Sequence, residues 1–287
     1  MGTSSSYGGP PNKSPLVPSW VGDLGTIPAD RPAVDPVPGV PPPPGTLPAA
    51  APPPIPPNAP SDRYTAARSN FTSFAKAGGT GGGGAALRRA LSSYVRGSGG
   101  RGGAASRMAS SCKTASQLAG FIRSVEQGGT AYALREFKCA QLVGKPAGEA
   151  IEQLVDVFCP DGGPVDDSIA RQAFQETVLD WLEKDLPSVD ELSAADWREF
   201  LADFTSRSIE NRIMADIGKN GIKVPADAKQ ALTVQRELHS VIRGCVDEAY
   251  KETGASFDGM SDSAISALMK NVYERVWEYV EELGGEE

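Results

Sequence analysis

Apolar residues recur at every third or fourth position through most of the chain beyond residue 60, which is the spacing of one face of an α-helix. No segment shows the strict alternation of apolar and polar residues that is typical of a half-buried strand. The pattern therefore predicts an all-α, multi-helix domain whose helices are mostly antiparallel. The periodic segments are 61–77, 85–97, 117–129, 130–144, 149–158, 168–187, 194–218, 225–253 and 261–283, with short Ala/Ser-rich helices between 104 and 116.

Capping residues predict where several of these helices begin. Ser61 precedes the first helix as an N-cap, and Asp166 or Asp167 is expected to cap the segment 168–187. Ser193 is followed by Asp196 three positions later, which is a capping-box pattern for the segment 194–218. Pro225 is suited to start the next helix, because its fixed φ matches the first helical turn.

The apolar positions also predict which side of each helix faces the core. Tyr94 belongs to the apolar stripe of 85–97, and Trp181 and Leu182 belong to that of 168–187. Leu232 and Leu238 mark the expected core side of 225–253.

The first 60 residues have a different composition. They contain 19 of the 24 prolines, and proline both fixes φ and removes a backbone donor, so neither a helix nor a sheet is expected. We expect a disordered Gly/Pro-rich arm over 1–60 that carries an exposed N-terminus and has polyproline II geometry towards its end. Leu16, Val17 and Trp20 form the strong apolar cluster of this arm.

Charge divides the chain unevenly. Residues 1–145 carry 15 Lys and Arg against 6 Asp and Glu, whereas 146–287 carry 13 against 30, which gives the chain a net charge of −8. We therefore expect three parts: the arm 1–60, a basic segment 61–145 of short Gly-interrupted helices, and an acidic helical domain 146–287 that packs with it. The acidic domain is not expected to bind nucleic acid itself.

The residue types that usually build an active site are sparse. The single histidine, His239, lies in a helical segment, and none of the four cysteines has the CxxC spacing of a zinc site. The glycine run 78–84 lacks the GK[ST] of a phosphate-binding loop. Glu176 and Asp180 are spaced as neighbours on a helix, and a solvated face explains them better than catalysis. We expect no enzyme activity, no cofactor and no metal; an independent enzyme that uses clustered carboxylates is the weakest alternative.

The basic, glycine-rich segment leaves three interpretations open. Its cations could bind the backbone of nucleic acid, contact acidic surfaces of this chain or of a partner protein, or simply form a solvated surface. Tyr94 lies among these cations in the sequence. The candidate nucleic-acid residues are Arg88, Arg89, Arg96 and Arg101.

The N-terminus is a further candidate site. Gly2 is small, so removal of Met1 is expected, and it leaves an unhindered α-amine with a pKa of about 8. The first residues also match the N-myristoylation pattern, but a single acyl chain binds membranes only marginally, and an unmodified terminus is the simplest alternative. The sequence has no apolar run of 18 residues and no signal peptide, which predicts a cytoplasmic protein without a membrane partner.

Several segments in a fixed order resemble one family. They are MGTSSSYGGP, PLVPSW, ARSNFTSFAKAGG, ALRRALSSYVRG and VDVFCPDGGPVDDSIARQAFQET. Together they resemble QatB, a component of bacterial Qat anti-phage defence systems, over nearly the whole chain. The resemblance implies three partners: an ATPase (QatA), a QueC-like enzyme (QatC) and a TatD-like nuclease (QatD). ATP hydrolysis and DNA cleavage would then belong to those partners.

The resemblance also gives the N-terminus a role. QueC-type enzymes activate a carboxylated 7-deazaguanine with ATP and pass it to an amine, and Gly2 is the best-presented amine of this chain. The implied function is a non-enzymatic substrate and adaptor subunit, with Leu16, Val17 and Trp20 as a docking anchor for QatC. The alternative is an adaptor that delivers nucleic acid to the TatD-like nuclease. The residues that would form the recognition peptide after Gly2 are Thr3, Ser4, Ser5, Ser6, Tyr7, Gly8, Gly9 and Pro10.

Overall fold

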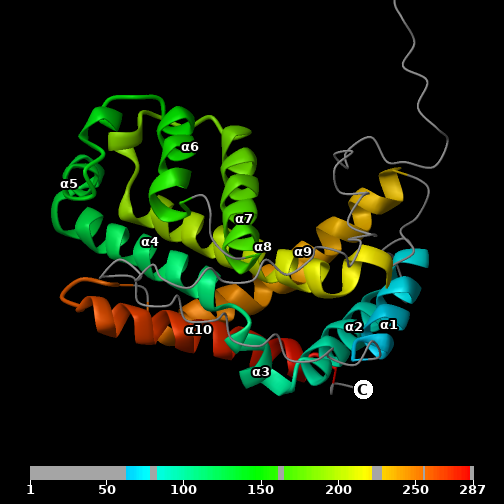
Figure 1. The fold of residues 1–287 in the computed structure, drawn as a ribbon. Helices are drawn as coiled ribbons and strands as arrows, with labels where there is room; N and C mark the ends of the chain where they lie inside the picture. Colours follow the sequence, from blue (N-terminus) through cyan, green and yellow to red (C-terminus); the bar gives the residue numbers. More distant parts are fainter. Residues whose placement is uncertain (1–62, 78–82, 161–164, 222–227, 255, 285–287) are drawn as a thin grey trace, which may run out of the picture. The chain divides into compact units, whose positions relative to one another are not determined.

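Helices account for nearly all of the regular structure that the computed structural model describes, which covers residues 63–77, 83–160, 165–221, 228–254 and 256–284. These residues belong to one unit, Pro56–Glu287, and contain ten α-helices, two 3₁₀ turns and no strand (Figure 1). The predicted all-α fold is therefore confirmed. The predicted arm over 1–60 lies outside the described residues.

The helices follow the chain in a simple order. They are α1 Thr65–Lys76, α2 Gly83–Gly97, α3 Gly100–Ser106, α4 Ala109–Gly128, α5 Thr130–Glu136, α6 Ala147–Phe158, α7 Val165–Leu182, α8 Ala194–Gly221, α9 Ala228–Thr253 and α10 Asp262–Glu282. The 3₁₀ turns are Ala140–Leu142 and Val189–Glu191.

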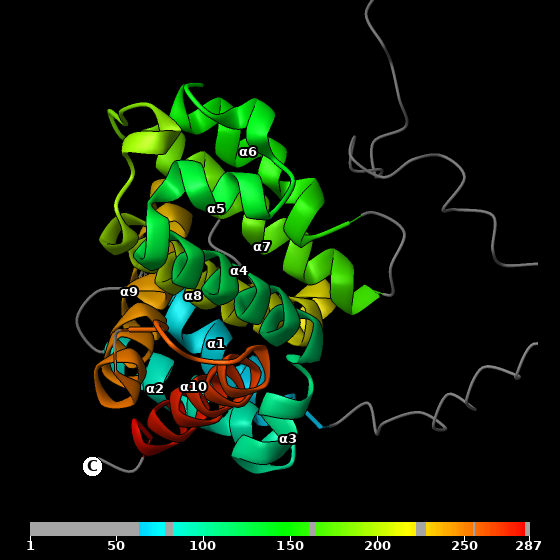
Figure 2. The same ribbon diagram turned by 90° about the vertical axis from the view of Figure 1, so that its left-hand side faces the viewer.

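α8 is the central helix of this arrangement. It packs against α7, α9 and α4 and also contacts α1, while α10 packs against α9, α4, α3 and α2. Figure 2 shows α5, α6 and α7 above α4 and α8, with α2, α3 and α10 below them. Because α8 has neighbours on several sides, polar side chains on it lie between helices and need partners there.

The core contains most of the apolar positions that the periodicity predicts. Trp181 and Tyr94 are buried as expected. Rings from both sides of residue 145 meet in it, for instance Phe121 and Phe158, whose centroids are 5.9 Å apart. The division of the chain at 60 and 145 stays a prediction.

Two predicted core residues are wrong. Leu182 is 47% exposed, because it is the last residue of α7 and its side chain lies over Gly148 at the start of α6. Leu232 is 52% exposed, because it lies in the part of α9 before Leu238, where none of residues 229–237 is buried.

The predicted capping box has its expected bonds, and the predicted start of the last segment is also capped. The Ser193 backbone N–H donates to Asp196 Oδ2 at 2.7 Å, and the Asp196 N–H donates back to Ser193 Oγ at 3.3 Å. Ser261 caps α10 by accepting from the N–H of Ala264 at 3.2 Å. The residues Ser61 and Pro225 lie outside the described residues.

The predicted caps of the segment 168–187 are wrong. α7 already begins at Val165, so Asp166 and Asp167 lie in its first turn, where negative charge stabilises the helix dipole.

The basic half differs from its prediction at two helix ends. The expected break near residue 116 is absent: α4 is continuous, and Ser116 lies inside it with its Oγ donating to the Cys112 carbonyl one turn earlier at 2.7 Å. The helix expected over 130–144 instead ends at Glu136. Lys138 there has φ of 60°, a left-handed conformation that stops a helix.

Candidate functional site

The residues predicted to act at the N-terminus lie outside the described residues. These are Gly2, the recognition residues 3–10, and the anchor residues Leu16, Val17 and Trp20. Their roles stay predictions.

A surface that we call the basic hairpin consists of α1, α2 and the preceding Arg63. Residues 63–97 contain no Asp or Glu. The two helices are joined along their length, since Asn70 Nδ2 donates to Ser93 Oγ at 3.2 Å and the Tyr64 hydroxyl lies 3.1 Å from Ser98 Oγ. The cations of the basic hairpin are Arg63, Arg68, Lys76, Arg88, Arg89 and Arg96.

The structure brings three of the four predicted nucleic-acid residues together. Arg88, Arg89 and Arg96 are exposed on α2, and Arg96 Nη2 donates to Ser92 Oγ at 3.1 Å. Arg101 lies instead on α3 and forms an ion pair with Glu278 of α10. The fourth predicted residue is therefore already engaged within the protein.

Tyr94 is a core residue rather than a ring available to a ligand. Its ring stacks on Tyr64 with centroids 5.1 Å apart and lies 5.5 Å from that of Trp277. Its hydroxyl donates to Asp216 Oδ2 at 2.9 Å. Burial, and then the charge of Asp216, raise the pKa of Tyr94 well above its ordinary value, so the phenol stays neutral.

Asp216 of α8 connects the basic hairpin to the centre of the fold. Arg107 donates to both of its carboxylate oxygens, at 3.0 and 2.8 Å, and the hydroxyls of Tyr64 and Tyr94 also donate to it. The side chain of Asp216 is only 9% exposed. Helical periodicity does not single out this residue. Its one sequence signal is an isolated acid next to the buried Ile217.

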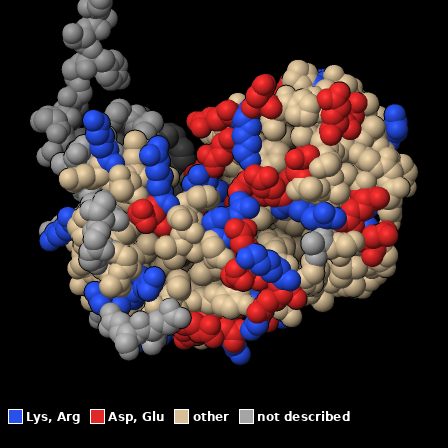
Figure 3. All heavy atoms as spheres, turned by 180° about the vertical axis from the view of Figure 1, so that it is seen from behind, with Lys and Arg blue, Asp and Glu red and all other residues tan. Residues whose placement is uncertain are grey.

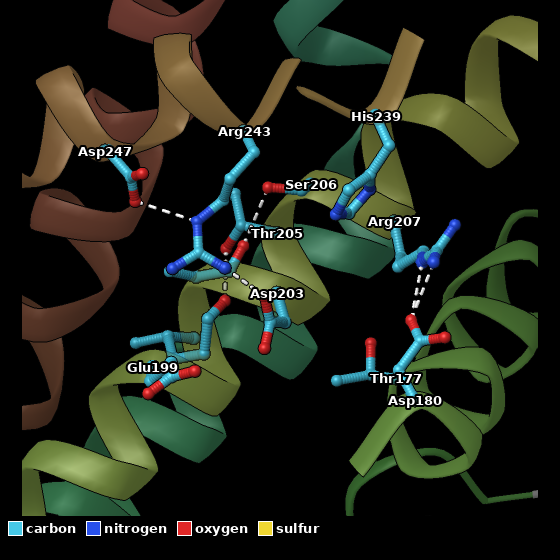
Figure 4. Close-up of polar contacts among 12 residues, drawn as sticks. Thr177, Asp180, Glu199, Asp203, Thr205, Ser206, Arg207, His239, Arg243 and Asp247 are labelled. Atoms are coloured by element: carbon cyan, nitrogen blue, oxygen red, sulfur yellow. Dashed lines mark hydrogen bonds and ion pairs between the residues drawn. The ribbon is translucent and has the colours of Figure 1, made fainter. Parts of the chain in front are cut away.

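A row of paired charged side chains lies between α7, α8 and α9, and we call it the charged seam. At one end Arg243 Nε donates to Asp247 Oδ1 at 2.8 Å, and Arg243 also pairs with Asp203 (Figure 4). Trp181 Nε1 donates to Asp203 as well, at 2.8 Å. The residues of the charged seam are Asp180, Asp203, Arg207, Glu210, His239, Arg243 and Asp247.

The other end of the charged seam is centred on Glu210, whose side chain is only 6% exposed. Its Oε1 lies 2.6 Å from His239 Nδ1, and its Oε2 lies 3.3 Å from Arg207 Nη1. Arg207 also donates to Asp180 Oδ2 at 2.7 Å, as Figure 4 shows. His239 therefore lies on a helix, as predicted, and its ring is engaged by a carboxylate.

An apolar groove of about 290 Å³ lies beside this end and is lined by residues of α1, α7, α8 and α9. Phe71, Phe74 and Leu238 contribute to its walls, and Glu176 and Glu210 to its polar part. Both carboxylates already accept hydrogen bonds, Glu176 from Asn211 at 2.9 Å. The arrangement resembles a structural ion-pair network more than an unpaired general base at a substrate site.

Comparison with known families identifies the chain. A family model described as Qat anti-phage system associated protein QatB matches residues 99–280, which is more than half of the chain. The chain belongs to the QatB family. It is thus a component of a Qat anti-phage system, as the sequence resemblance implies. Neither the curated proteins nor the solved structures gave a match.

The QatB-family match covers only part of the features described above. It begins after α2 and ends within α10, so it includes Asp216 and the whole charged seam. The basic hairpin and the arm precede the matched range. The family match of this QatB-family chain therefore gives no information about the basic hairpin or the arm.

The remaining predicted chemistry concerns metals, membranes and thiols. In the described parts of the chain, no group of three His, Cys, Asp or Glu side chains could hold a metal ion. None of the helices in those parts is both long and apolar enough to cross a bilayer. All four cysteines are free thiols whose pKa is raised by burial, to about 11 for Cys245.

Proposed function

We propose that this chain is a non-enzymatic subunit of a cytoplasmic Qat complex that presents its own N-terminal Gly2 amine to the QueC-like partner QatC for a deazaguanine-type modification. In this function the helical body is a carrier, and residues 3–10 with Leu16, Val17 and Trp20 are what QatC recognises. QatA and QatD are further partners of the same complex. Membership of the QatB family supports the setting.

The observation that carries the proposal is the ion pairing of several lysine amines, which would compete with the N-terminal amine for the modification. Several lysines of the helical body are held by carboxylates, and the hydrogen bond with Glu248 raises the pKa of Lys251. This bond favours the protonated form of the Lys251 amine, and a protonated amine has no lone pair with which to attack. The pairs are Lys145 with Glu149 at 2.6 Å, Lys184 with Glu199 at 2.8 Å, Lys251 with Glu248 at 2.5 Å and Lys270 with Glu274 at 3.9 Å.

A glycine α-amine has the opposite properties. With a pKa of about 8 it is roughly a tenth neutral at pH 7, whereas an ordinary lysine with a pKa of about 10.4 is less than about a thousandth neutral. The difference is about two orders of magnitude in available nucleophile before any positioning. Gly2 also lacks the Cβ that would crowd a narrow active site.

The proposed reaction is an acyl transfer. The neutral Gly2 nitrogen attacks the carboxyl carbon that QatC has activated with ATP, and a C–N bond forms. The bond from that carbon to the activating group breaks, and the group leaves with its electron pair. The nitrogen loses a proton to solvent, and the product is an amide.

Intact mass after coexpression tests this function. We expect one deazaguanine-sized addition when QatC is present and none when it is absent. Gly2→Leu should retain Met1 and lose both the addition and protection against phage. Gly2→Ala is the matched control, because Met1 is still removed and a free α-amine remains, so the addition should persist. Full modification and protection with Gly2→Leu would refute the proposal.

A further inference from the structure

The basic hairpin gathers cations without carboxylate partners and has no acid of its own, whereas the other such cations of the described structure, Lys113, Arg135, Lys138 and Arg236, are spread over α4, α5 and the residues after it, and α9. Arg63, Lys76 and Arg88 are exposed and form no ion pair with any described residue, and Arg96 is held only by the hydroxyl of Ser92. Figure 3 shows blue spheres predominating at the left, over the end that carries α1, α2 and the start of α9, while red and blue alternate elsewhere. The positive charge of the basic hairpin is therefore directed to solvent.

These four cations are spread along the two helices. A Cβ on Gly97 would lie only 2.6 Å from the Arg63 carbonyl oxygen, so Arg63 and Arg96 lie at the same end. Lys76 ends α1 eleven residues after its first residue, about 17 Å away at 1.5 Å per residue. One strand of B-DNA has a phosphate for about every 3.4 Å of its axis, so about five phosphates of a strand occur within this length, some of which face the surface.

The rest of the exposed face is small and polar. Thr65, Ser69 and Ser73 are exposed on α1, and hydroxyls of this kind are frequent phosphate ligands. The core of a protein–protein interface is usually apolar, but no large exposed apolar residue occurs in the described parts of α1, α2 and α3. Those that the structure describes lie elsewhere: Tyr132, Val157, Val165, Leu179, Leu182, Met214 and Leu232. The face fits a phosphate backbone better than an acidic protein.

The aromatic residues of the basic hairpin are not available to bases. Tyr64, Phe71, Phe74 and Tyr94 are all buried. Proteins that hold single strands usually stack bases on exposed aromatic rings, and the described part of the basic hairpin has no such ring. Binding here would depend on phosphates and not on base sequence.

The charge of the chain would also orient the ligand. The half 146–287 carries 30 Asp and Glu against 13 Lys and Arg and repels a polyanion. Approach from the side of the basic hairpin is therefore favoured.

We infer that the basic hairpin binds the phosphodiester backbone of nucleic acid through Arg63, Lys76, Arg88 and Arg96, without reading the bases. This binding activity goes beyond the proposed function and does not depend on Gly2.

Salt-dependent binding of the full chain to a labelled duplex DNA of random sequence tests the inference. Four phosphate contacts predict a slope of log K against log salt of about −3.6, so the affinity should fall about a hundredfold between about 50 and 200 mM salt. An unlabelled duplex of different sequence should compete equally. Absence of binding at about 50 mM salt, or a strong sequence preference, would overturn the inference.

Two triple variants with the same change in net charge separate this surface from general electrostatics. Arg63→Ser, Arg88→Ser and Arg96→Ser together should reduce the slope to about −1, because three contacts are lost. The control changes Lys184, Lys251 and Lys270 to Ser, three exposed cations outside the basic hairpin, and should leave the slope unchanged. An equal loss in both variants would overturn the inference.

Two further measurements exclude misfolding and an acidic protein ligand. Replacing Arg63, Arg88 and Arg96 by Lys keeps the charges and should keep the slope near −3.6; loss of binding in this variant would contradict a backbone contact. Polyglutamate of matched charge should compete at least tenfold more weakly than DNA. Equal competition would assign the surface to an acidic protein instead.

Discussion

The basic hairpin and the charged seam both contain arginine side chains, but the surroundings of these side chains are opposite in the two regions. Arg207 and Arg243 in the charged seam face carboxylates from neighbouring helices, whereas Arg88 in the basic hairpin faces none in the described structure. The cause lies in the sequence, since residues 63–97 contain no Asp or Glu while α7, α8 and α9 contain many. A cation that is paired supports the fold, and one that is left unpaired at the surface is available to a ligand.

Asp216 gives the largest expected effect, because it ties the basic hairpin to α8, the helix that also carries part of the charged seam. Asp216→Ala removes the partner of Arg107 and of two tyrosine hydroxyls in a nearly buried site. We expect the free energy of unfolding to fall by about 3 kcal/mol, measured by urea denaturation.

The control is Asp156→Ala. Asp156 also pairs with an arginine, Arg171, but its side chain is 75% exposed, so a loss within about 1 kcal/mol is expected. Equal losses for the two variants would contradict the assignment of Asp216 as a buried structural anchor.

Two double-mutant cycles compare the strength of a partly buried and an exposed ion pair inside the helical body. The pair Arg243–Asp203 is partly buried, whereas Lys251–Glu248 is mostly exposed. We expect coupling energies of about 1–2 kcal/mol for the first pair and below about 0.5 kcal/mol for the second. Chemical denaturation of the wild type, the single variants and the double variants measures both, and a reversed order would show that burial does not decide the strength of these pairs.

The buried thiols should show the smallest effect at neutral pH. Burial raises the pKa of Cys245 to about 11, so at pH 8 it should carry roughly a hundredfold less thiolate than an ordinary thiol and should react slowly with a disulfide reagent. The neutral thiol of Cys245 also contributes to the stability of the folded state. Because the folded-state pKa is higher than the unfolded one, this contribution is complete below the unfolded pKa of about 8.5. It is lost as the pH rises towards 11.

The measurement is the rate of thiol modification of the native chain compared with the urea-unfolded chain, together with stability between pH 8 and 11. A native rate equal to the unfolded rate at pH 8 would refute the burial of Cys245. A free energy of unfolding that rises between pH 8 and 11 would contradict the predicted loss of stability.

Local features of the fold were predictable from sequence. The helical periodicity located the buried residues Trp181 and Tyr94, and the spacing of Ser193 and Asp196 located the start of α8, because both depend on residues within a few turns of each other. The prediction that Leu182 is buried was wrong, because its exposure depends on where α7 ends relative to α6.

The candidate surfaces were only partly predictable for the same reason. Arg88, Arg89 and Arg96 share one helix, and the sequence grouped them correctly. Arg101 was grouped with them, but Glu278, about 180 positions away along the chain, pairs with it. Asp216 and the charged seam depend on contacts between helices distant in sequence, which periodicity does not reveal.

The site of modification on the coexpressed chain is the most direct test of the central claim, that this QatB-family protein acts through its N-terminal amine. Tandem mass spectrometry of all peptides after coexpression with QatC should place the addition on the α-amine of Gly2, with no addition on Lys145, Lys184, Lys251 or Lys270. An addition on any lysine, with Gly2 unmodified, would contradict the account.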